Sequence, residues 1–438
     1  MKYGVLTKDL ESAPAPPREG FEYSGQAKRV LGALWLMVLL VMAVPTIGAS
    51  ILNAQMVIDL RLDRGVFGMG FGLFILMMGL PGPLVAIATT RLGYRWVATF
   101  GCTLFVLGAV SMASWVTQGW QFAIAFGLLI GGGVAFAGML PAQTVVTKWF
   151  YLRRALAVSV VLSAIEIGGF ISPPGLDALM NLLGNNWRAA WWFIAGLGVL
   201  ALLSAWLIIR EEEIDRRVAQ TLTAGNEVFM NPNVHKSAFE WTLRQAVQTR
   251  SFWLLLLYVS FVGTAWVFVM AHGVVHLQDL GFSSAESAMA VAVLVAGSFI
   301  GNIGAGVLGD RISPHYIAAV AVALMAGGLV QMMRPVDSAG IFAYALPLGM
   351  GYGASQVCIM ALIGNYYGKS SFPMLFGVMM PPSTVLSAIG AAASGALFDA
   401  TGEYQVAFWT AIALCAVLVP AMLATTPPSP RPQHGCQR

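Results

Sequence analysis

Two stretches decide the fold of this chain: Thr90-Arg91-Leu92-Gly93-Tyr94-Arg95 and Asp310-Arg311-Ile312-Ser313-Pro314-His315, which lie half a chain length apart. Each stretch follows a glycine-rich apolar run and precedes another apolar run. A duplicated soluble helical protein could also repeat a motif, but not between apolar runs of this length. A basic hinge that joins apolar helices and occurs twice at this spacing is typical of a duplicated membrane transporter.

The composition agrees with a membrane protein. Of the 438 residues, 58% are hydrophobic and only 10% are charged, whereas a soluble protein has about 25% charged residues. A run of about 20 apolar residues spans the hydrocarbon core as a helix, and strands are excluded because these runs do not alternate with polar residues. We count twelve such runs, with approximate bounds 30–54, 67–89, 95–116, 121–146, 154–179, 187–209, 252–277, 285–309, 314–333, 339–363, 371–396 and 404–425.

The placement of the basic residues predicts the orientation. With the N-terminus inside, all but four of the 24 Lys and Arg residues fall on the cytoplasmic side. The exceptions are Arg61, Arg64, Arg188 and Arg334. By the positive-inside rule both termini are then cytoplasmic, which requires an even number of spans. The basic surplus is explained by this orientation, so no nucleic-acid partner is expected.

We therefore predict an all-α membrane protein with twelve transmembrane helices in two six-helix bundles, placed in an inner or plasma membrane. The polar, proline-rich N-terminal segment resembles a disordered tail rather than a signal peptide. The polar interval in the middle of the chain is too small and too mixed for a catalytic domain. The predicted segments are an N-terminal cytoplasmic tail (1–29), an N-terminal bundle (30–209), a cytoplasmic linker (210–250), a C-terminal bundle (251–426) and a C-terminal tail (427–438).

Aromatic residues repeat in register with the duplication. Trp149-Phe150 closes the fourth predicted span as Tyr366-Tyr367 closes the tenth, and Trp187 opens the sixth as Tyr404 opens the twelfth. Aromatic residues also gather at membrane interfaces without any duplication. The matching register of several pairs favours the duplication.

Six plus six spans with a Gly-x-x-x-Asp-Arg hinge resemble the major facilitator superfamily. The second hinge keeps Gly306, Asp310 and Arg311, with Ser313 where the family has glycine. The first keeps its cations and one glycine, but has Thr90 in place of the aspartate and Ala86 in place of the glycine. The resemblance implies a cytoplasmic gate motif made of Arg91, Gly93, Arg95, Gly306, Asp310 and Arg311.

Further motifs resemble monocarboxylate transporters and the bacterial oxalate–formate antiporter group. They are Lys148-Trp149-Phe150-x-x-Arg153-Arg154-Ala155-Leu156-Ala157, Gly168-Gly169-Phe170-Ile171-x-Pro173-Pro174, His276-Leu277-x-Asp279-Leu280-Gly281-Phe282 and Gly395-Ala396-Leu397-Phe398-Asp399-x-x-Gly402-x-Tyr404.

The hinge residues suit a latch on the cytoplasmic face. The arginines can bind carbonyls or carboxylates at neighbouring helix ends, and Asp310 can lie near a helix N-terminus, where an anion is stabilised. Alternatively, the cations only anchor the topology by reaching the membrane surface.

Glu166 is the ionisable residue well inside the N-terminal half. It shares a helical face with Ser159, Ser163 and Phe170. A buried charge is costly in the membrane, so a protonated form becomes accessible near neutral pH and suits a proton-coupling site. Alternatively, Glu166 is a neutral structural contact between helices.

Other polar residues can join this path. His272 has a near-neutral intrinsic pKa that suits proton-linked gating, although a single membrane histidine is more often a packing residue. Asn302, Tyr352 and Gln356 are placed for a cavity or, equally, for bonds between helices.

The predicted spans 285–309 and 371–396 contain no Lys or Arg, whereas the resembled families place a carboxylate-binding cation there. This argues against a dicarboxylate such as oxalate, weakens a monocarboxylate as the substrate, and makes a weakly acidic or neutral solute carried with a proton a competitor. We predict a proton-coupled, monomeric transporter of a monocarboxylate-like organic acid that works by alternating access. The alternatives are an exporter of apolar or aromatic compounds and, remotely, a non-transporting membrane sensor. No enzyme activity, cofactor or metal is expected, because no catalytic set, phosphate loop or Cys/His cluster occurs.

Overall fold

The computed structural model describes residues 24–48, 52, 55–56, 59–61, 64–151, 153–208, 231–237, 239, 241–333 and 337–429. This part of the chain is almost entirely helical and contains no strand. Eleven helical spans are long and apolar enough to cross a membrane. A twelfth consists of two helices bent by 43° at a short break. The predicted all-α fold with twelve spans is therefore confirmed.

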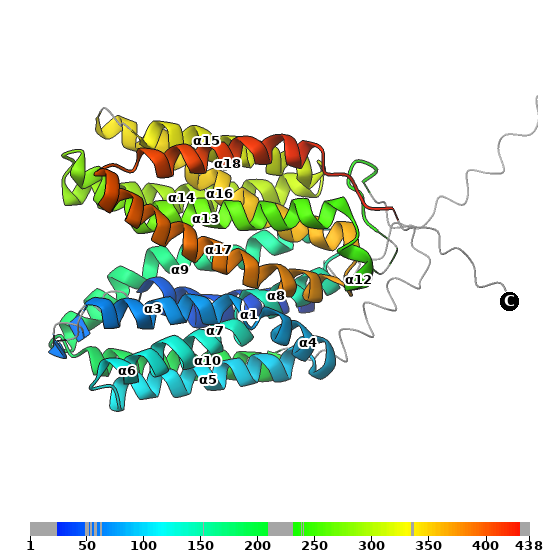
Figure 1. Ribbon diagram of the computed structural model, residues 1–438. Helices are drawn as coiled ribbons and strands as arrows, with labels where there is room; N and C mark the ends of the chain where they lie inside the picture. Colours follow the sequence, from blue (N-terminus) through cyan, green and yellow to red (C-terminus); the bar gives the residue numbers. More distant parts are fainter. Residues whose placement is uncertain are drawn as a thin grey trace, which may run out of the picture.

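The N-terminal half, which lies at the bottom of Figure 1, forms the first six spans. Its helices are α1 (Gly25–Val38), η2 (Leu39–Gly48), α3 (Arg64–Gly79), α4 (Gly82–Leu92), α5 (Tyr94–Ser114), α6 (Gly119–Phe122), η3 (Ala123–Ile130), α7 (Gly131–Ala137), α8 (Met139–Trp149), α9 (Arg154–Leu182) and α10 (Trp187–Ile208). The first span is α1 continued by the π-helix η2, and the second is the bent pair of α3 and α4. The fourth runs from α6 to α8.

The C-terminal half is more regular, with one helix for each span. After the short helix α12 (Leu243–Ala246) come α13 (Arg250–Asp279), α14 (Ser284–Gly309), α15 (Pro314–Met332), α16 (Ser338–Tyr367), α17 (Phe372–Thr401) and α18 (Gln405–Leu423). In Figure 1 this half lies above the first, and α12 lies at one end of the molecule. We call that end the linker face.

The structure places helix in parts of the predicted N-terminal tail and of the predicted linker. Ser24 caps α1 by accepting the N–H of Ala27 (3.1 Å), so the first helix begins at Gly25, inside the segment predicted as a tail (1–29). Residues 1–23, and residues 210–230, 238 and 240 of the predicted linker, lie outside the described residues. The last part of the linker forms α12, which Thr242 and Gln245 cap reciprocally.

The two halves meet along matching helices. The α9 helix packs against α14, and α4 packs against α17. Both crossings depend on glycine. A Cβ on Gly306 would overlap Ser159, and a Cβ on Gly377 would lie 2.6 Å from the carbonyl oxygen of Gly82. Close backbone approach of this kind is how small residues support helix association in a membrane.

Candidate functional site

Glu166 lies near the middle of α9 and binds the opposite half. Its Oε1 accepts the hydroxyl of Ser298 (3.1 Å), and its Oε2 accepts the amide Nδ2–H of Asn302 (3.4 Å). Both partners are on α14, one turn apart, and both are buried. The carboxyl group of the N-terminal half is thus held by two neutral donors of the C-terminal half.

Asn302 has a second polar atom without a partner. Its side chain is fully buried, and its Oδ1 accepts no hydrogen bond from the described residues. A buried acceptor left in this state is costly, and it marks a place where a ligand group can bind. Ser298 was not predicted from the sequence. Its spacing of four residues from Asn302, on one helical face, was the available signal.

A second group of side chains lies beside this carboxyl. Tyr352 and Gln356 lie one turn apart on α16. The residue after Tyr352, Gly353, packs on α14 so closely that a Cβ there would overlap the carbonyl oxygen of Ser298, the residue that donates to Glu166. The ring of Tyr352, on α16, stacks on that of Trp266, on α13, with centroids 3.8 Å apart and planes 6° apart. Both rings are only partly buried. Trp266 was not among the predicted site residues.

The two serines of the predicted α9 stripe have other partners. Ser163 accepts the indole N–H of Trp35 in its own half (3.1 Å). Ser159 donates to the carbonyl of Leu156 (2.8 Å) and lies against Gly306 of the other half. The structure thus brings Glu166 together with Asn302, while Ser163 serves packing inside the N-terminal half.

His272 lies apart from Glu166. One ring nitrogen contacts the carbonyl of Ala391 (3.0 Å), and the other contacts the hydroxyl of Tyr404 (3.2 Å). Both partners belong to the C-terminal half. These hydrogen bonds join α13 to α17 and to the start of α18, so His272 has the contacts of a residue that packs helices together.

Asp310 sits at the end of α14 and caps α9 across the interface between the halves. Its two carboxylate oxygens accept the backbone N–H groups of Ala155 and Leu156, each at 3.1 Å. These N–H groups belong to the first turn of α9, where intrahelical acceptors are lacking and the helix dipole favours an anion. The backbone carbonyl of Arg311 accepts the amide of Asn231 from the linker (2.8 Å).

The first hinge has no corresponding acid cap. The hydroxyl of Thr90 donates to carbonyls of its own helix, those of Ala86 and Ile87, both at 3.0 Å. In the register of the duplication the partners would be the first residues of α17, where Pro373 has no N–H. This corner therefore lacks both the acid and one of the two donors.

The remaining hinge residues of the first half have local roles. Gly93 joins α4 to α5 with φ of 84°, a conformation that favours glycine. The guanidinium of Arg95 stacks on Trp206 of the same half, 3.8 Å from the ring centroid. The exposed Arg91 lies in the last turn of α4, where a cation is favourable.

Contacts that the sequence did not predict join the halves at the linker face. The guanidinium of Arg154, which is 1% exposed, donates to Asn365 Oδ1 (2.9 Å) at the end of α16. The linker residue Ser237 donates its N–H to the carbonyl of the same Asn365 (2.7 Å). Its neighbour Lys236 donates to the carbonyl of Tyr151 in the N-terminal half. The linker thus contacts both halves.

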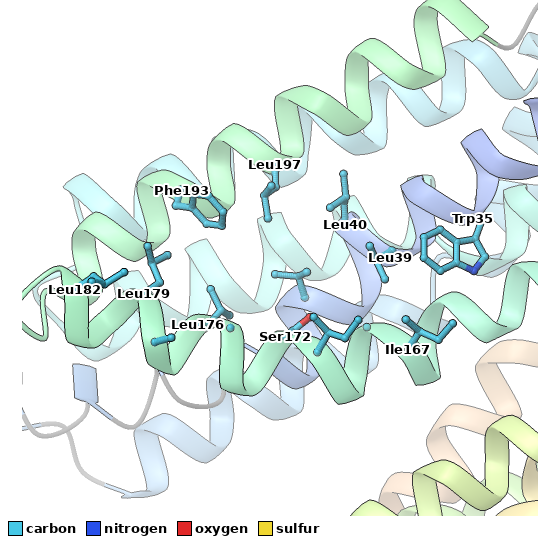
Figure 2. Close-up of a pocket in the computed structure, with 15 residues that line it drawn as sticks. Trp35, Leu39, Leu40, Ile167, Ser172, Leu176, Leu179, Leu182, Phe193 and Leu197 are labelled. Atoms are coloured by element: carbon cyan, nitrogen blue, oxygen red, sulfur yellow. The ribbon is translucent and has the colours of Figure 1, made fainter.

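A separate apolar pocket of about 440 Å³ lies between helices of the N-terminal half (Figure 2), and it opens to the outside of the bundle, because Ile171, Leu182 and Phe193 in its lining are exposed. The wall is formed by α1, η2, α9 and α10, and it is almost wholly aliphatic and aromatic. Figure 2 shows Leu176, Leu179, Phe193 and Leu197 pointing into the space between α9 and α10. The walls are hydrophobic enough for an apolar ligand, whose binding requires no polar partner.

Charged and metal-binding groups are scarce in the described spans. No group of three or more His, Cys, Asp or Glu residues could hold a metal ion within the part of the chain that the structure describes. The helices α14 to α18 contain no Lys or Arg. The environment of Glu166 on the C-terminal side is therefore built from amides, hydroxyls and aromatic rings.

Comparisons with known proteins agree with this architecture. The family model described as Major Facilitator Superfamily matches residues 34–381 and 275–436. The rat protein named monocarboxylate transporter 13 is 25% identical over 74% of this chain and 72% of its own length. The agnestins efflux protein AgnL12 of Paecilomyces divaricatus is 25% identical over 74% of this chain and 70% of its own length. Among solved structures, the fucose:proton symporter FucP of E. coli has a TM-score of 0.65 and 16% identity, over 90% of this chain and 98% of that chain.

Proposed function

Since the chain belongs to the major facilitator superfamily, a family of transporters, we propose that it carries a monocarboxylate-like organic acid together with a proton by alternating access. The observation that carries this proposal is the bridge from Glu166 to Ser298 and Asn302. A carboxyl group at mid-membrane, bound by the opposite half, can couple its protonation to the movement of the halves. The relatives named monocarboxylate transporters support the substrate class.

In this proposal the contacts between the halves at the linker face keep that face closed in one state of the transport cycle. Asp310 capping α9, and Arg154 bound to Asn365, hold the two halves together there. For the substrate to leave by this face, these bonds must break. Because Glu166 also spans the interface, the same movement separates it from Ser298 and Asn302. Protonation of Glu166 and opening of the linker face then shift the same equilibrium between the closed and the open state.

The direct test is uptake of labelled monocarboxylic acids into proteoliposomes, with and without an inward proton gradient. We expect the gradient to stimulate uptake by the natural protein. Glu166→Gln keeps the size of the side chain and one of the two acceptor oxygens but cannot ionise, so uptake should respond clearly less to the gradient than in the natural protein. Exchange of labelled for unlabelled acid should partly persist.

Protein-free liposomes measure passive entry of the acids, and Asp177→Asn, at the exposed end of α9, is the matched control that removes another α9 acid. If Glu166→Gln follows the gradient like the natural protein, the proton role is wrong. If no acid responds to the gradient in any variant, the proposed function is wrong.

We also propose that the linker face is the cytoplasmic face of an inner or plasma membrane and that the protein works as a monomer. The distribution of basic residues supports this orientation. A membrane-impermeant maleimide should then label Cys436 only after the membrane is permeabilised. Labelling on intact cells would reverse the orientation, and a mass above one chain in detergent would contradict the monomer.

A second candidate function is export of apolar or aromatic compounds. The open apolar pocket between α9 and α10 and the relatives named as efflux proteins favour it. Expression in a drug-sensitive host separates the two functions. An exporter should raise resistance to hydrophobic compounds without any dependence on added organic acids, whereas an acid transporter should not.

A further inference from the structure

We propose that the carried solute is an aryl carboxylic acid that binds as the uncharged acid, with its O–H on Asn302 Oδ1 and its ring beside the Trp266–Tyr352 stack. This rests on the proposed function, because it specifies the substrate class of the same site. Three independent features of the described residues support it: the charge of the site, one unused acceptor and one aromatic platform.

The charge of the site disfavours an anion. Glu166 is held by neutral donors only, and the helices α14 to α18 contain no Lys or Arg. A carboxylate that leaves water for such a place loses its hydration and gains no cation, which costs far more than burying a neutral acid. An ionised Glu166 would repel it in addition. The uncharged acid avoids both costs.

The unused acceptor selects a hydrogen-bond donor. The amide of Asn302 gives its Nδ2–H to Glu166 (3.4 Å), while its Oδ1 is buried without a partner among the described residues. A carboxylic acid O–H would complete this hydrogen-bonding set, whereas a carboxylate has no proton to donate. A site with a buried acceptor discriminates strongly against ligands that leave it unpaired.

The aromatic platform selects a planar ring. Trp266 and Tyr352 lie nearly parallel, at 6° and 3.8 Å, and both keep part of their surface exposed. Gly353, the neighbour of Tyr352 in the chain, packs so closely on α14 that a Cβ on it would overlap the backbone carbonyl oxygen of Ser298. Ser298 donates its hydroxyl to Glu166 and lies one turn from Asn302. The platform and the unused acceptor therefore belong to one site, and a further ring can extend the stack.

The test compares three acids by calorimetric binding to the full chain in nanodiscs. Benzoic acid has a planar ring, cyclohexanecarboxylic acid has a ring of similar size without π electrons, and acetic acid has none. We expect benzoic acid to bind at least about tenfold more tightly than the other two. Its affinity per total acid should fall as the pH rises and the uncharged fraction disappears.

Variants assign this preference to the named groups. Trp266→Leu should abolish the preference for benzoic acid, and Trp266→Phe should keep most of it. The control Trp409→Leu, at an exposed position of α18, should bind as the natural protein does. Asn302→Leu should weaken all three acids by about tenfold, because the acceptor is lost.

Three results would each overturn the proposal. They are equal affinity for the two ring acids, an affinity that depends on the concentration of the carboxylate rather than of the uncharged acid, and unchanged selectivity in a folded Trp266→Leu. Gradient-driven uptake of acetic acid with no advantage for ring acids would refute this inference and leave the proposed function intact. Selective binding of benzoic acid without any gradient-driven uptake would instead refute the proposed function, while the proposed binding site for an aryl acid would still stand.

Discussion

At the scale of single residues, Asp310 contacts a helix of the opposite half, whereas its counterpart Thr90 contacts its own helix. Asp310 reaches two backbone N–H groups of α9, so its charge is used where a helix N-terminus needs an acceptor. Thr90 satisfies its hydroxyl on its own helix. The duplicated motif thus has one working acid, and the α4–α17 corner relies on close packing.

The first prediction concerns this acid. Asp310→Asn keeps the shape of the side chain but removes its charge, so the contact between halves should weaken by about 1 kcal/mol. The ratio of open to closed linker face should then rise about fivefold. The measurement is the rate at which a maleimide labels Thr147→Cys, a buried position beside Arg154.

Thr90→Asp provides the complementary comparison. Because Pro373 offers no N–H, the new acid should change the labelling rate by less than about twofold. The double variant Thr90→Asp with Pro373→Leu should slow labelling clearly. An unchanged rate in Asp310→Asn would show that the cap does not hold the face closed.

At the scale of elements, α9 carries three of the contacts between the halves. Its first turn is capped by Asp310, its second turn lies against Gly306, and its middle carries Glu166. All three contacts are with α14. A movement of α14 relative to α9 would therefore change the Asp310 cap at the linker face and the contacts of Glu166 together.

The second prediction tests the close approach of these helices. In Gly306→Ala the new Cβ would overlap Ser159, so the crossing should be destabilised by about 1–3 kcal/mol. Uptake and the Tm in detergent should both fall. Gly304→Ala is the matched control on the same helix, because a Cβ there meets no atom within 4 Å.

A compensating change makes this test specific. Ser159→Gly should restore the Tm and uptake of Gly306→Ala, because it removes the side chain that the new methyl group meets. If Gly304→Ala is as harmful as Gly306→Ala, the loss reflects helix α14 as a whole rather than its contact with α9.

At the scale of the whole molecule, two bundles are joined at one face by the interface helices and by the linker. The described part of the linker contacts both halves: Lys236 binds Tyr151 of the N-terminal half, and Ser237 binds Asn365 of the C-terminal half. The hydrogen bonds between the halves named above extend from mid-membrane to this face. This is the arrangement expected of a transporter closed on the linker side.

The third prediction concerns a disulfide that would hold the linker face closed. A Cβ on Gly309 would lie 2.9 Å from that of Ala155, and a disulfide needs about 3.8 Å, so a small shift permits the bond. With Cys436 replaced by serine, the pair Ala155→Cys and Gly309→Cys should lose at least about 90% of uptake on oxidation. Each single variant under the same oxidant is the control.

A reducing agent should restore the uptake of the double variant. Full uptake by the oxidised, cross-linked protein would show that the linker face does not open during transport. Loss of uptake in the single variants alone would attribute the effect to the substitutions.

Much of this protein follows from the sequence alone. Twelve apolar runs predict the spans because lipid leaves the backbone no other partner than its own helix, and they match the observed helices closely. Glu166 was identifiable because an acid in such a run is costly. The unequal hinges were visible as Asp310 against Thr90.

Only the tertiary structure decided what these residues touch. Ser298 and Trp266 look ordinary in the sequence, and Arg154 looks like an interfacial cation until Asn365, 211 residues away, is found beside it. The physical reason is that crossing a membrane depends on the hydropathy of each segment alone. A binding site depends on which segments meet, and small-residue helix packing and long-range hydrogen bonds decide that in three dimensions.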